Sequence, residues 1–225
     1  MKIAVVIPAF NEGKVIDKVL KKIPQKIAQH KVKIIVINDG STDDTEKVVR
    51  KNRQLVITHP INRGLGAALA TGFAYARKNN FGLLVTLDGD GQHDPQEIAK
   101  LIKPILKKEA DFVVGTRVFK QGMPKFKQIL TLLASLATFI LTGVWTTDSQ
   151  SGFRAFSKKA ITLIDIQVDR MEVSSDFFRQ AKLLKLKIVE IPIKPIYTRY
   201  SIAKGQSSWN SLNIIGQLTF KRILE

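Results

Sequence analysis

The 225-residue chain contains no cysteine, which excludes disulfide bonds, thiol nucleophiles and zinc sites built on cysteine. Its three histidines, His30, His59 and His93, are widely separated, which argues against a metal site made of histidines. The apolar run at 3–10 is too short for a secretory signal. The apolar fraction of 44% excludes a disordered polyelectrolyte, and the length predicts one main domain with a substantial core.

Acidic residues are scarce as well. The 36 lysines and arginines exceed the 19 aspartates and glutamates, so the formal net charge is +17. Two stretches, 112–147 and 191–224, contain no acid at all. Because ordinary surfaces mix both signs, these stretches favour an anionic partner, although a solvated basic face is the alternative. A nucleic acid, an anionic membrane and a phosphorylated substrate all remain candidates at this point.

Short apolar runs alternate with helical patterns over the first 116 residues. The runs are rich in Val, Ile and Leu, which is typical of strands buried on both faces. This alternation predicts an α/β fold with a parallel sheet, in which ligands bind at the carboxyl ends of the strands. The predicted strands are 3–7, 33–37, 55–58, 83–87 and 112–115, and the predicted helices are 12–23, 42–51, 66–78 and 95–106.

A stretch without charge at 128–147 would form a helix about 30 Å long, enough to cross a bilayer. However, small polar residues recur along it at helical spacing: Thr131, Ser135, Thr138 and Thr142. We therefore favour an amphipathic helix that lies in the membrane interface or packs on the domain over a transmembrane span.

A second apolar stripe at helical spacing occurs at 207–224, beside Lys221 and Arg222. It predicts a C-terminal amphipathic helix. Such a helix would lie at the membrane or dock on the core, and the sequence does not distinguish the two.

Two aspartates, Asp88 and Asp90, follow the predicted strand at 83–87. In an extended segment both side chains would point the same way, because side chains alternate along the backbone. Two converging carboxylates are costly unless a cation neutralises them, and oxygen ligands select Mg²⁺ or Mn²⁺. Gln92 could add a neutral oxygen. A turn with solvated acids is the alternative.

Asp39 ends another predicted strand, where its carboxylate could accept hydrogen bonds from a ribose or a base edge. Gly40 permits a tight turn after it, and Ser41 or Thr42 can cap the helix that follows. Capping alone does not explain Asp39.

Two further segments follow strand ends. Pro8 is expected to end the first strand, Asn11 to cap the next helix, and Glu12 to lie in its first turn. Gly64 and Gly66 stand at a predicted helix start, where glycines can leave backbone N–H groups free for an anion. Close packing of a helix rich in small residues is the alternative.

Taken together, in order and spacing, these segments resemble the family 2 glycosyltransferases of GT-A fold. The matching motifs are Pro8-x-x-Asn11-Glu12, Asp39-Gly40-Ser41-x-Asp43, Asn62-x-Gly64-x-Gly66 and Asp88-x-Asp90-x-Gln92-His93-x-Pro95. Within the family the chain is similar to the dolichyl- and polyprenyl-phosphate sugar synthases, through Thr116-Arg117, Asp148-x-x-Ser151-Gly152-Phe153-Arg154, and Glu190-Ile191-Pro192 before Tyr197-Thr198-Arg199. The resemblance implies a Rossmann-like, mostly parallel central sheet flanked by helices.

The resemblance also implies site roles. The metal, Mg²⁺ or Mn²⁺, would be bound by Asp88, Asp90 and Gln92. The nucleotide sugar would be bound by Pro8, Asn11, Glu12, Asp39, Gly64, Asp88 and Lys204. The acceptor phosphate would be bound by Arg117, Ser151 and Arg154, and the catalytic residues would be Asp90, Arg117 and Arg199. This chain has Asn38-Asp39 where the family usually has paired acids, and Ser201-Ile202-Ala203-Lys204-Gly205 near a frequent Gly-x-Ser-Lys segment.

The implied reaction is an inverting transfer of a sugar, with mannose or glucose favoured, from a UDP- or GDP-sugar to a polyprenyl or dolichyl phosphate. A phosphate acceptor is already an anion at neutral pH, so it needs positioning by arginines more than it needs a base. Asp148 and Glu172 are the candidates if a base is used. The alternative is a GT-A enzyme that acts on a soluble or saccharide hydroxyl. A nucleic acid is disfavoured, because no aromatic residues interleave with the cations.

These expectations divide the chain into a catalytic domain at 1–205, with an interfacial helix region at 120–147, and a C-terminal amphipathic helix at 206–225. Cations near an anionic lipid surface contribute about 1 kcal/mol each. We therefore expect the protein at the cytoplasmic face of a membrane, either peripheral or anchored by a segment not in this chain.

Overall fold

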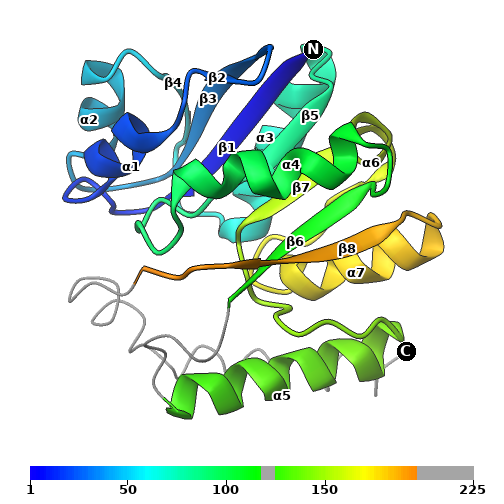
Figure 1. Ribbon diagram of the computed structural model, residues 1–225. Helices are drawn as coiled ribbons and strands as arrows, with labels where there is room; N and C mark the ends of the chain where they lie inside the picture. Colours follow the sequence, from blue (N-terminus) through cyan, green and yellow to red (C-terminus); the bar gives the residue numbers. More distant parts are fainter. Residues whose placement is uncertain (118–124, 197–225) are drawn as a thin grey trace.

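A computed structural model of the chain describes residues 1–117 and 125–196, which form a curved sheet covered by helices (Figure 1). The strand order is β2-β3-β1-β5-β7-β6-β8, and β4 also pairs with β3. The strands are β1 (Lys2–Ala9), β2 (Lys26–Ile27), β3 (His30–Asp39), β4 (Leu55–His59), β5 (Leu83–Thr86), β6 (Phe112–Arg117), β7 (Arg154–Ser157) and β8 (Ile188–Ile193).

The mostly parallel sheet is confirmed. Strand β1 pairs in parallel with β3 and β5, β3 with β4, and β6 with β8. Strand β7 lies between β5 and β6 and is antiparallel to both, with Arg154 opposite Thr86 and Val114. The first residue of β7 therefore lies at the sheet edge where the parallel strands end. Strand β1 ends at Ala9, one residue beyond the proline expected to end it.

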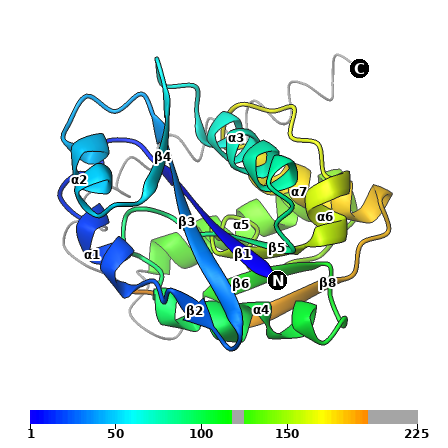
Figure 2. The same ribbon diagram turned by 90° about the horizontal axis from the view of Figure 1, so that it is seen from above.

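Helices cover both faces of the sheet (Figure 2). One core joins the sheet to the helices on the side of α1, α2 and α4, and a second core joins it to α3, α6 and α7. Because neighbouring β1 residues enter opposite cores, the strand is apolar throughout. The helices are α1 (Ile16–Lys22), α2 (Thr45–Lys51), α3 (Leu65–Lys78), the 3₁₀ helix η1 (Pro95–Glu97), α4 (Ile98–Leu106), α5 (Lys125–Thr142), α6 (Lys158–Leu163) and α7 (Val173–Leu183).

Two predicted helix caps are wrong. Asn11 adopts a left-handed conformation (φ 55°) four residues before the N-cap of α1, and its side-chain oxygen accepts a hydrogen bond from the backbone N–H of Thr42 (2.9 Å). Ser41 and Thr42 do not cap α2 either. The N-cap of α2 is Asp44, whose side chain forms no capping hydrogen bond, and the carboxylate of the preceding Asp43 accepts from the N–H of Thr45 (2.9 Å). The predicted caps are wrong because Asn11 is hydrogen-bonded to Ser41 and Thr42, which joins two loops and leaves none of these side chains to cap a helix.

The small polar residues of α5 point into the protein. Thr131, Ser135, Thr138 and Thr142 are all buried, and α5 packs along α7. The hydroxyls of Thr138 and Ser175 are hydrogen-bonded (2.9 Å), and the hydroxyl of Ser135 accepts from the N–H of Ser149 (3.2 Å). Packing on the domain, one of the two predicted arrangements, is therefore observed.

The opposite side of α5, which we call the apolar face, is exposed. Within the described ranges, no helix has the length and apolar character that crossing a bilayer requires. The C-terminal helix predicted at 206–225 lies outside the described residues. The exposed side chains of the apolar face are Ile129, Leu132, Leu133, Leu136, Phe139 and Ile140, with Trp145 just beyond the helix.

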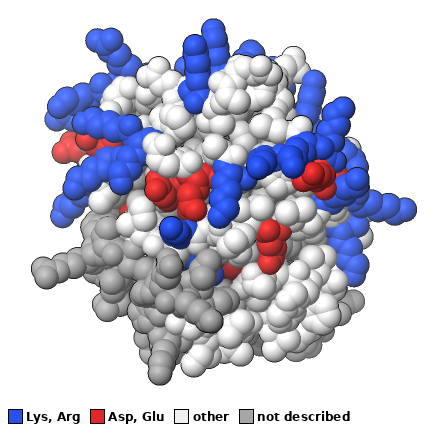
Figure 3. Space-filling view, in the orientation of Figure 1, with Lys and Arg blue, Asp and Glu red and all other residues white. Residues whose placement is uncertain are grey.

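Figure 3 shows that Lys and Arg side chains gather mainly over the upper part of the molecule, whereas the visible surface near α5 is largely uncharged. Arg117, one of the cations of the stretch 112–147, is paired with the buried carboxylate of Asp148, and its side chain is 16% exposed. Contact between the apolar face and an anionic membrane stays a prediction.

Candidate active site

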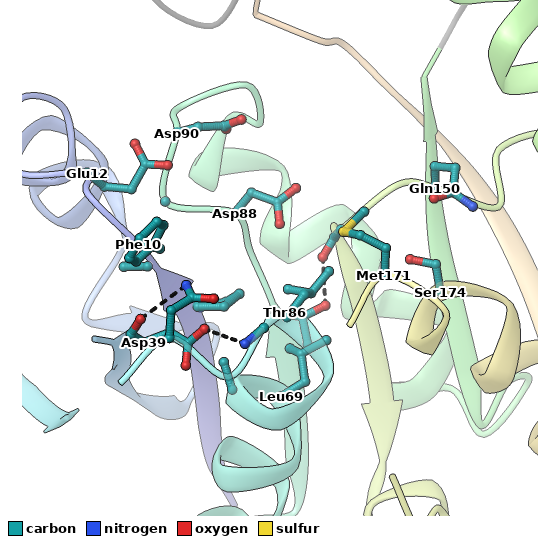
Figure 4. A pocket seen from close by; sticks show the side chains of 18 of the residues that line it. Phe10, Glu12, Asp39, Leu69, Thr86, Asp88, Asp90, Gln150, Met171 and Ser174 are labelled. Atoms are coloured by element: carbon teal, nitrogen blue, oxygen red, sulfur yellow. Dashed lines mark hydrogen bonds between the residues drawn. The ribbon is translucent and has the colours of Figure 1, made fainter. Parts of the chain in front are cut away.

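A cavity of about 340 Å³ opens where β1, β3 and β5 end, beside the start of β7 (Figure 4). Phe10, Glu12 and Asp39 lie on one side of it, Gln150 and Ser174 on the other, and Asp88 between them. The predicted site residues that line it are Pro8, Glu12, Asp39, Gly64, Asp88, Asp90 and Arg154. Asn11, Gln92, Arg117 and Ser151 are not among its lining residues, and Arg199 and Lys204 lie outside the described part of the chain.

At one end of the cavity, the carboxylate of Asp39 is held by the protein itself. The ring nitrogen Nδ1 of His59 lies 2.7 Å from its Oδ1. The backbone N–H groups of Arg63 and Gly64 donate to its two oxygens, at 3.0 and 2.7 Å. Such bonds to a charged acceptor are about twice as strong as neutral ones, so this end of the cavity is rigid before any ligand arrives.

Hydrogen bonds join the loop after β1 to the loop after β3. The backbone N–H of Asn11 donates to the hydroxyl of Ser41 (3.0 Å), and its side chain accepts from Thr42 (2.9 Å). The N–H of Glu12 donates to the hydroxyl of Thr45 (2.8 Å). Asn11 therefore does not line the cavity, but its hydrogen bonds fix the loop that carries the lining residue Glu12.

The glycines at the start of α3 serve close packing. Gly64 has φ 101°, and a Cβ there would lie 2.5 Å from the carbonyl oxygen of Asp169. A Cβ on Gly66 would lie 1.9 Å from the carbonyl oxygen of Val168. Close packing therefore accounts for both glycines, and the N–H of Gly64 already donates to Asp39, while an anion site at this helix start stays a prediction.

At the middle of the cavity, Asp88 and Asp90 share a half-buried loop with Gln92. The backbone and side-chain N–H groups of Gln92 donate to the two oxygens of Asp90, at 2.9 and 2.6 Å. Burial, and then the charge of Asp88, raise the pKa of Asp90. Burial alone would also raise the pKa of Asp88, but the hydrogen bond and charge of His93 and the charges of two arginines outweigh it and lower that pKa.

This loop fits a divalent cation. Two neighbouring carboxylates and an amide form an oxygen-rich set of the kind that Mg²⁺ and Mn²⁺ prefer. Burial and then the charge of Asp88 raise the pKa of Asp90, so a cation beside the pair would favour its charged form. No cluster of three or more His, Cys, Asp or Glu side chains occurs in the described ranges, so Gln92 as a third ligand stays a prediction.

Two arginines lie beyond the acidic pair, and of these only Arg154 lines the cavity. The guanidinium of Arg117 forms a fork with the buried carboxylate of Asp148, at 2.6 and 2.7 Å. Arg154 is 2% exposed, donates to the carbonyl oxygen of Ser149 (2.8 Å) and lies over the ring of Phe177 (5.1 Å). Burial lowers its pKa to about 10, against the charges of nearby aspartates, so it stays charged at neutral pH.

Sequence comparison identifies the family. Residues 4–163 match the profile of "Glycosyl transferase family 2". The chain belongs to glycosyl transferase family 2. The resemblance drawn from the motifs is thereby confirmed.

The sequence similarity to two named relatives covers most of this glycosyltransferase. It is 38% identical to the UDP-N-acetylglucosamine–dolichyl-phosphate N-acetylglucosaminyltransferase of Methanococcus voltae, over 99% of this chain and 94% of that protein. It is 29% identical to the undecaprenyl-phosphate mannosyltransferase of Micrococcus luteus, over 86% and 83%. The named relatives thus act on polyprenyl- or dolichyl-phosphate lipids.

Solved structures confirm the GT-A fold of the glycosyltransferase. The glucosyl-3-phosphoglycerate synthase of Mycobacterium tuberculosis, crystallised with Mn²⁺, UDP and its product, superposes with a TM-score of 0.72. The match covers 88% of this chain and 72% of that one at 23% sequence identity, so it establishes the fold alone.

Several lining residues of the glycosyltransferase cavity were not predicted. Gln150 lies inside a motif that the resemblance used, so its position in the sequence could have indicated it. Ser174, in the first turn of α7, and Met171, just before that helix, belong to no motif and carry no signal. His59, which contacts Asp39, ends a strand that the sequence indicates only through its apolar residues.

Two predicted alternatives for a general base find little support in the geometry. Asp148 is fully buried and its two oxygens accept from Arg117. Glu172 does not line the cavity, and one of its carboxylate oxygens is buried without a hydrogen-bond partner among the described residues. Ser151, predicted to bind the acceptor phosphate, is buried, and its hydroxyl accepts a hydrogen bond from the N–H of Phe153 (3.4 Å).

Proposed function

We propose that this protein transfers a sugar from a nucleotide-diphosphate sugar to a polyprenyl or dolichyl phosphate, with inversion, at a membrane surface and with Mg²⁺ or Mn²⁺. One observation carries the proposal. A single cavity holds a rigid carboxylate, Asp39, at one end, the acidic pair Asp88 and Asp90 in the middle, and a buried cation, Arg154, beyond them. A nucleoside, a metal-bound diphosphate and an anionic acceptor would meet these groups in that order.

Asp39 would accept hydrogen bonds from the nucleoside, and Glu12 and Pro8 would line the same end. The relative that is 38% identical over nearly the whole chain is named for UDP-N-acetylglucosamine. UDP-N-acetylglucosamine is therefore the first donor to test, followed by UDP-glucose and GDP-mannose. The structural neighbour crystallised with UDP and Mn²⁺ supports a uridine nucleotide and a divalent metal.

Asp88, Asp90 and Gln92 would hold the cation. When bound, the cation neutralises charge that develops on the leaving diphosphate. Arg199 and Lys204, proposed to act on the same diphosphate, lie outside the described residues.

Arg154, together with Arg117 and Ser151, would orient the acceptor phosphate. An oxygen of that phosphate attacks the anomeric carbon while the bond from this carbon to the diphosphate oxygen breaks, which inverts the configuration. The acceptor oxygen carries no proton at neutral pH, so no residue has to remove one. Asp148, already bound to Arg117, would orient that arginine instead.

The apolar face of α5 would dock on the lipid that carries the acceptor. Exposed apolar patches of this kind mark membrane or protein contacts in soluble folds. The test is flotation with vesicles of phosphatidylglycerol and phosphatidylcholine. Leu136→Glu, at a position 44% exposed on this face, should reduce vesicle binding, whereas Leu183→Glu, at a position 67% exposed on α7, should not. Equal binding of both variants would contradict the docking.

The decisive experiment is a donor and acceptor screen. The full chain is incubated with each nucleotide sugar, Mn²⁺ or Mg²⁺, and a short polyprenyl phosphate, and the glycolipid is detected by mass spectrometry. Transfer that needs the metal is expected with at least one UDP- or GDP-sugar. Transfer to a saccharide or soluble hydroxyl, with none to any lipid phosphate, would support the alternative acceptor class.

A further inference from the structure

His93 is a buried side chain beside the metal loop. The residue is 4% exposed, and its Nε2 lies 3.3 Å from Oδ2 of Asp88. The ring stacks on the ring of Phe153, with centroids 5.3 Å apart and planes inclined by 29°. Stacking fixes the plane in which the two ring nitrogens can form hydrogen bonds.

The other ring nitrogen of His93, Nδ1, is buried and has no hydrogen-bond partner among the described residues. The ring therefore has one polar partner there, the carboxylate of Asp88. A neutral imidazole carries one proton, and only Nε2–H can donate to that carboxylate. The packing thus selects the tautomer with its proton on Nε2.

The carboxylate of Asp88 is confined from a second direction. A Cβ on Gly152 would lie 2.2 Å from its Oδ1 and 2.3 Å from its Oδ2, so the backbone of residue 152 packs directly against it. This backbone is itself tied to the sheet, because the hydroxyl of Thr86 donates to the carbonyl oxygen of Gly152 (2.7 Å). Of the two contacts, His93 supplies the one that depends on direction.

From these contacts we infer that His93 is a positioning residue that orients the carboxylate of Asp88 for the divalent cation. The inference rests on the proposed metal-dependent function. Hydrogen-bond partners behind metal ligands typically change metal affinity 10- to 100-fold when they are removed. The contact of 3.3 Å stands at the long end of hydrogen bonds, as is common for catalytic contacts before ligands bind.

The test separates the hydrogen bond from packing. His93→Phe keeps a ring that can stack on Phe153 but removes the donor, and His93→Gln keeps an amide N–H near the place of Nε2. Mn²⁺ binding to the full chain with UDP is measured by electron paramagnetic resonance, and thermal unfolding of the metal-free protein is followed in parallel. We expect His93→Phe to unfold near the wild-type temperature while its Mn²⁺ dissociation constant rises roughly 10- to 100-fold. His93→Gln should recover most of that affinity.

Wild-type Mn²⁺ affinity in His93→Phe would overturn the positioning role. If this variant does not fold, the Mn²⁺ affinities of His93→Gln and His93→Asn are compared instead. The asparagine side chain is one bond shorter and should not reach Asp88. Equal Mn²⁺ affinities of these two variants would overturn the inference. Nitrogen-15 spectra of the metal-free protein should show a proton on Nε2 of His93, and a ring whose Nε2 carries no proton would contradict the inference. A wild-type protein that binds neither UDP nor Mn²⁺ would instead refute the proposed function.

Discussion

The two acidic parts of the cavity are built in opposite ways. The carboxylate of Asp39 accepts hydrogen bonds from two backbone N–H groups and contacts a histidine ring, so the protein itself stabilises its charge. Asp88 and Asp90 lie close together, and burial, followed by the charge of Asp88, raises the pKa of Asp90. The end proposed for the nucleoside has its hydrogen bonds in place before binding, whereas the end proposed for the metal holds two neighbouring carboxylates whose repulsion a cation would relieve. Stored repulsion of this kind strengthens metal binding at the expense of metal-free stability.

The largest effect is expected from Asp90→Asn. The substitution removes a proposed metal ligand, and losing several kcal/mol of charge stabilisation lowers turnover roughly 10³-fold or more. The metal-free variant should unfold at a higher temperature than the wild type, because the repulsion with Asp88 is gone. Turnover with Mn²⁺ and calorimetry without it measure the two effects. Unchanged turnover would refute the metal role.

Asp39→Asn should have the opposite effect on stability. It replaces a buried carboxylate that accepts charge-assisted bonds, and we expect it to destabilise the metal-free protein by about 2–3 kcal/mol. Urea unfolding gives the value. If both asparagine variants shift stability in the same direction, the contrast between the two ends is wrong.

A backbone substitution sharpens the comparison at the metal end. Gly152→Ala places a Cβ 2.2 Å from Oδ1 of Asp88 and should displace this carboxylate, weakening Mn²⁺ binding about tenfold, the lower range for disturbing a ligand's surroundings. Gly89→Ala is the matched control, because its Cβ would meet its neighbours at an ordinary 3.5 Å. Binding of Mn²⁺ with UDP is measured for both, and equal losses would contradict the role of the 152 backbone.

The smallest effect concerns pH. The folded-state pKa of Asp90 lies above its ordinary 3.8, so its contribution to stability is present below pH 3.8 and is lost as the pH rises through the raised pKa. Asp88 acts with the opposite sign, because its pKa is lowered. The free energy of unfolding is measured against pH for the metal-free wild type and for metal-free Asp90→Asn, and the difference between the two curves should fall as the pH rises. Saturating Mn²⁺ should abolish this fall. A difference that does not change with pH would contradict the repulsion between Asp88 and Asp90.

The first half of the fold could be predicted because strands buried on both faces read as continuous apolar runs. The other strands give no such signal. Strand β2 has two residues, β7 begins with a buried arginine, and β8 contains Glu190 and Pro192. The polar stripe of α5 was visible as a spacing, but its inward direction was not, since helices usually bury their apolar side.

The site divides in the same way. Asp39, Asp88 and Asp90 could be predicted because each follows a strand whose carboxyl end lies at the ligand edge. Met171 and Ser174 reach the cavity only through the packing of α7 beside β7, which no local pattern encodes. The contact between His59 and Asp39 joins two strand ends and depends on the parallel register of β3 and β4.

The hydrogen bonds between the loops after β1 and β3 have a consequence for ligand exchange. Asn11 and Glu12 on one loop are bonded to Ser41, Thr42 and Thr45 on the other, so neither loop can swing outward alone. These loops form a single hinge-free wall. If the cavity holds a nucleotide as proposed, its release would depend on the opposite wall, around Gln150 and Ser174, for which the described residues show no hydrogen bond to these two loops.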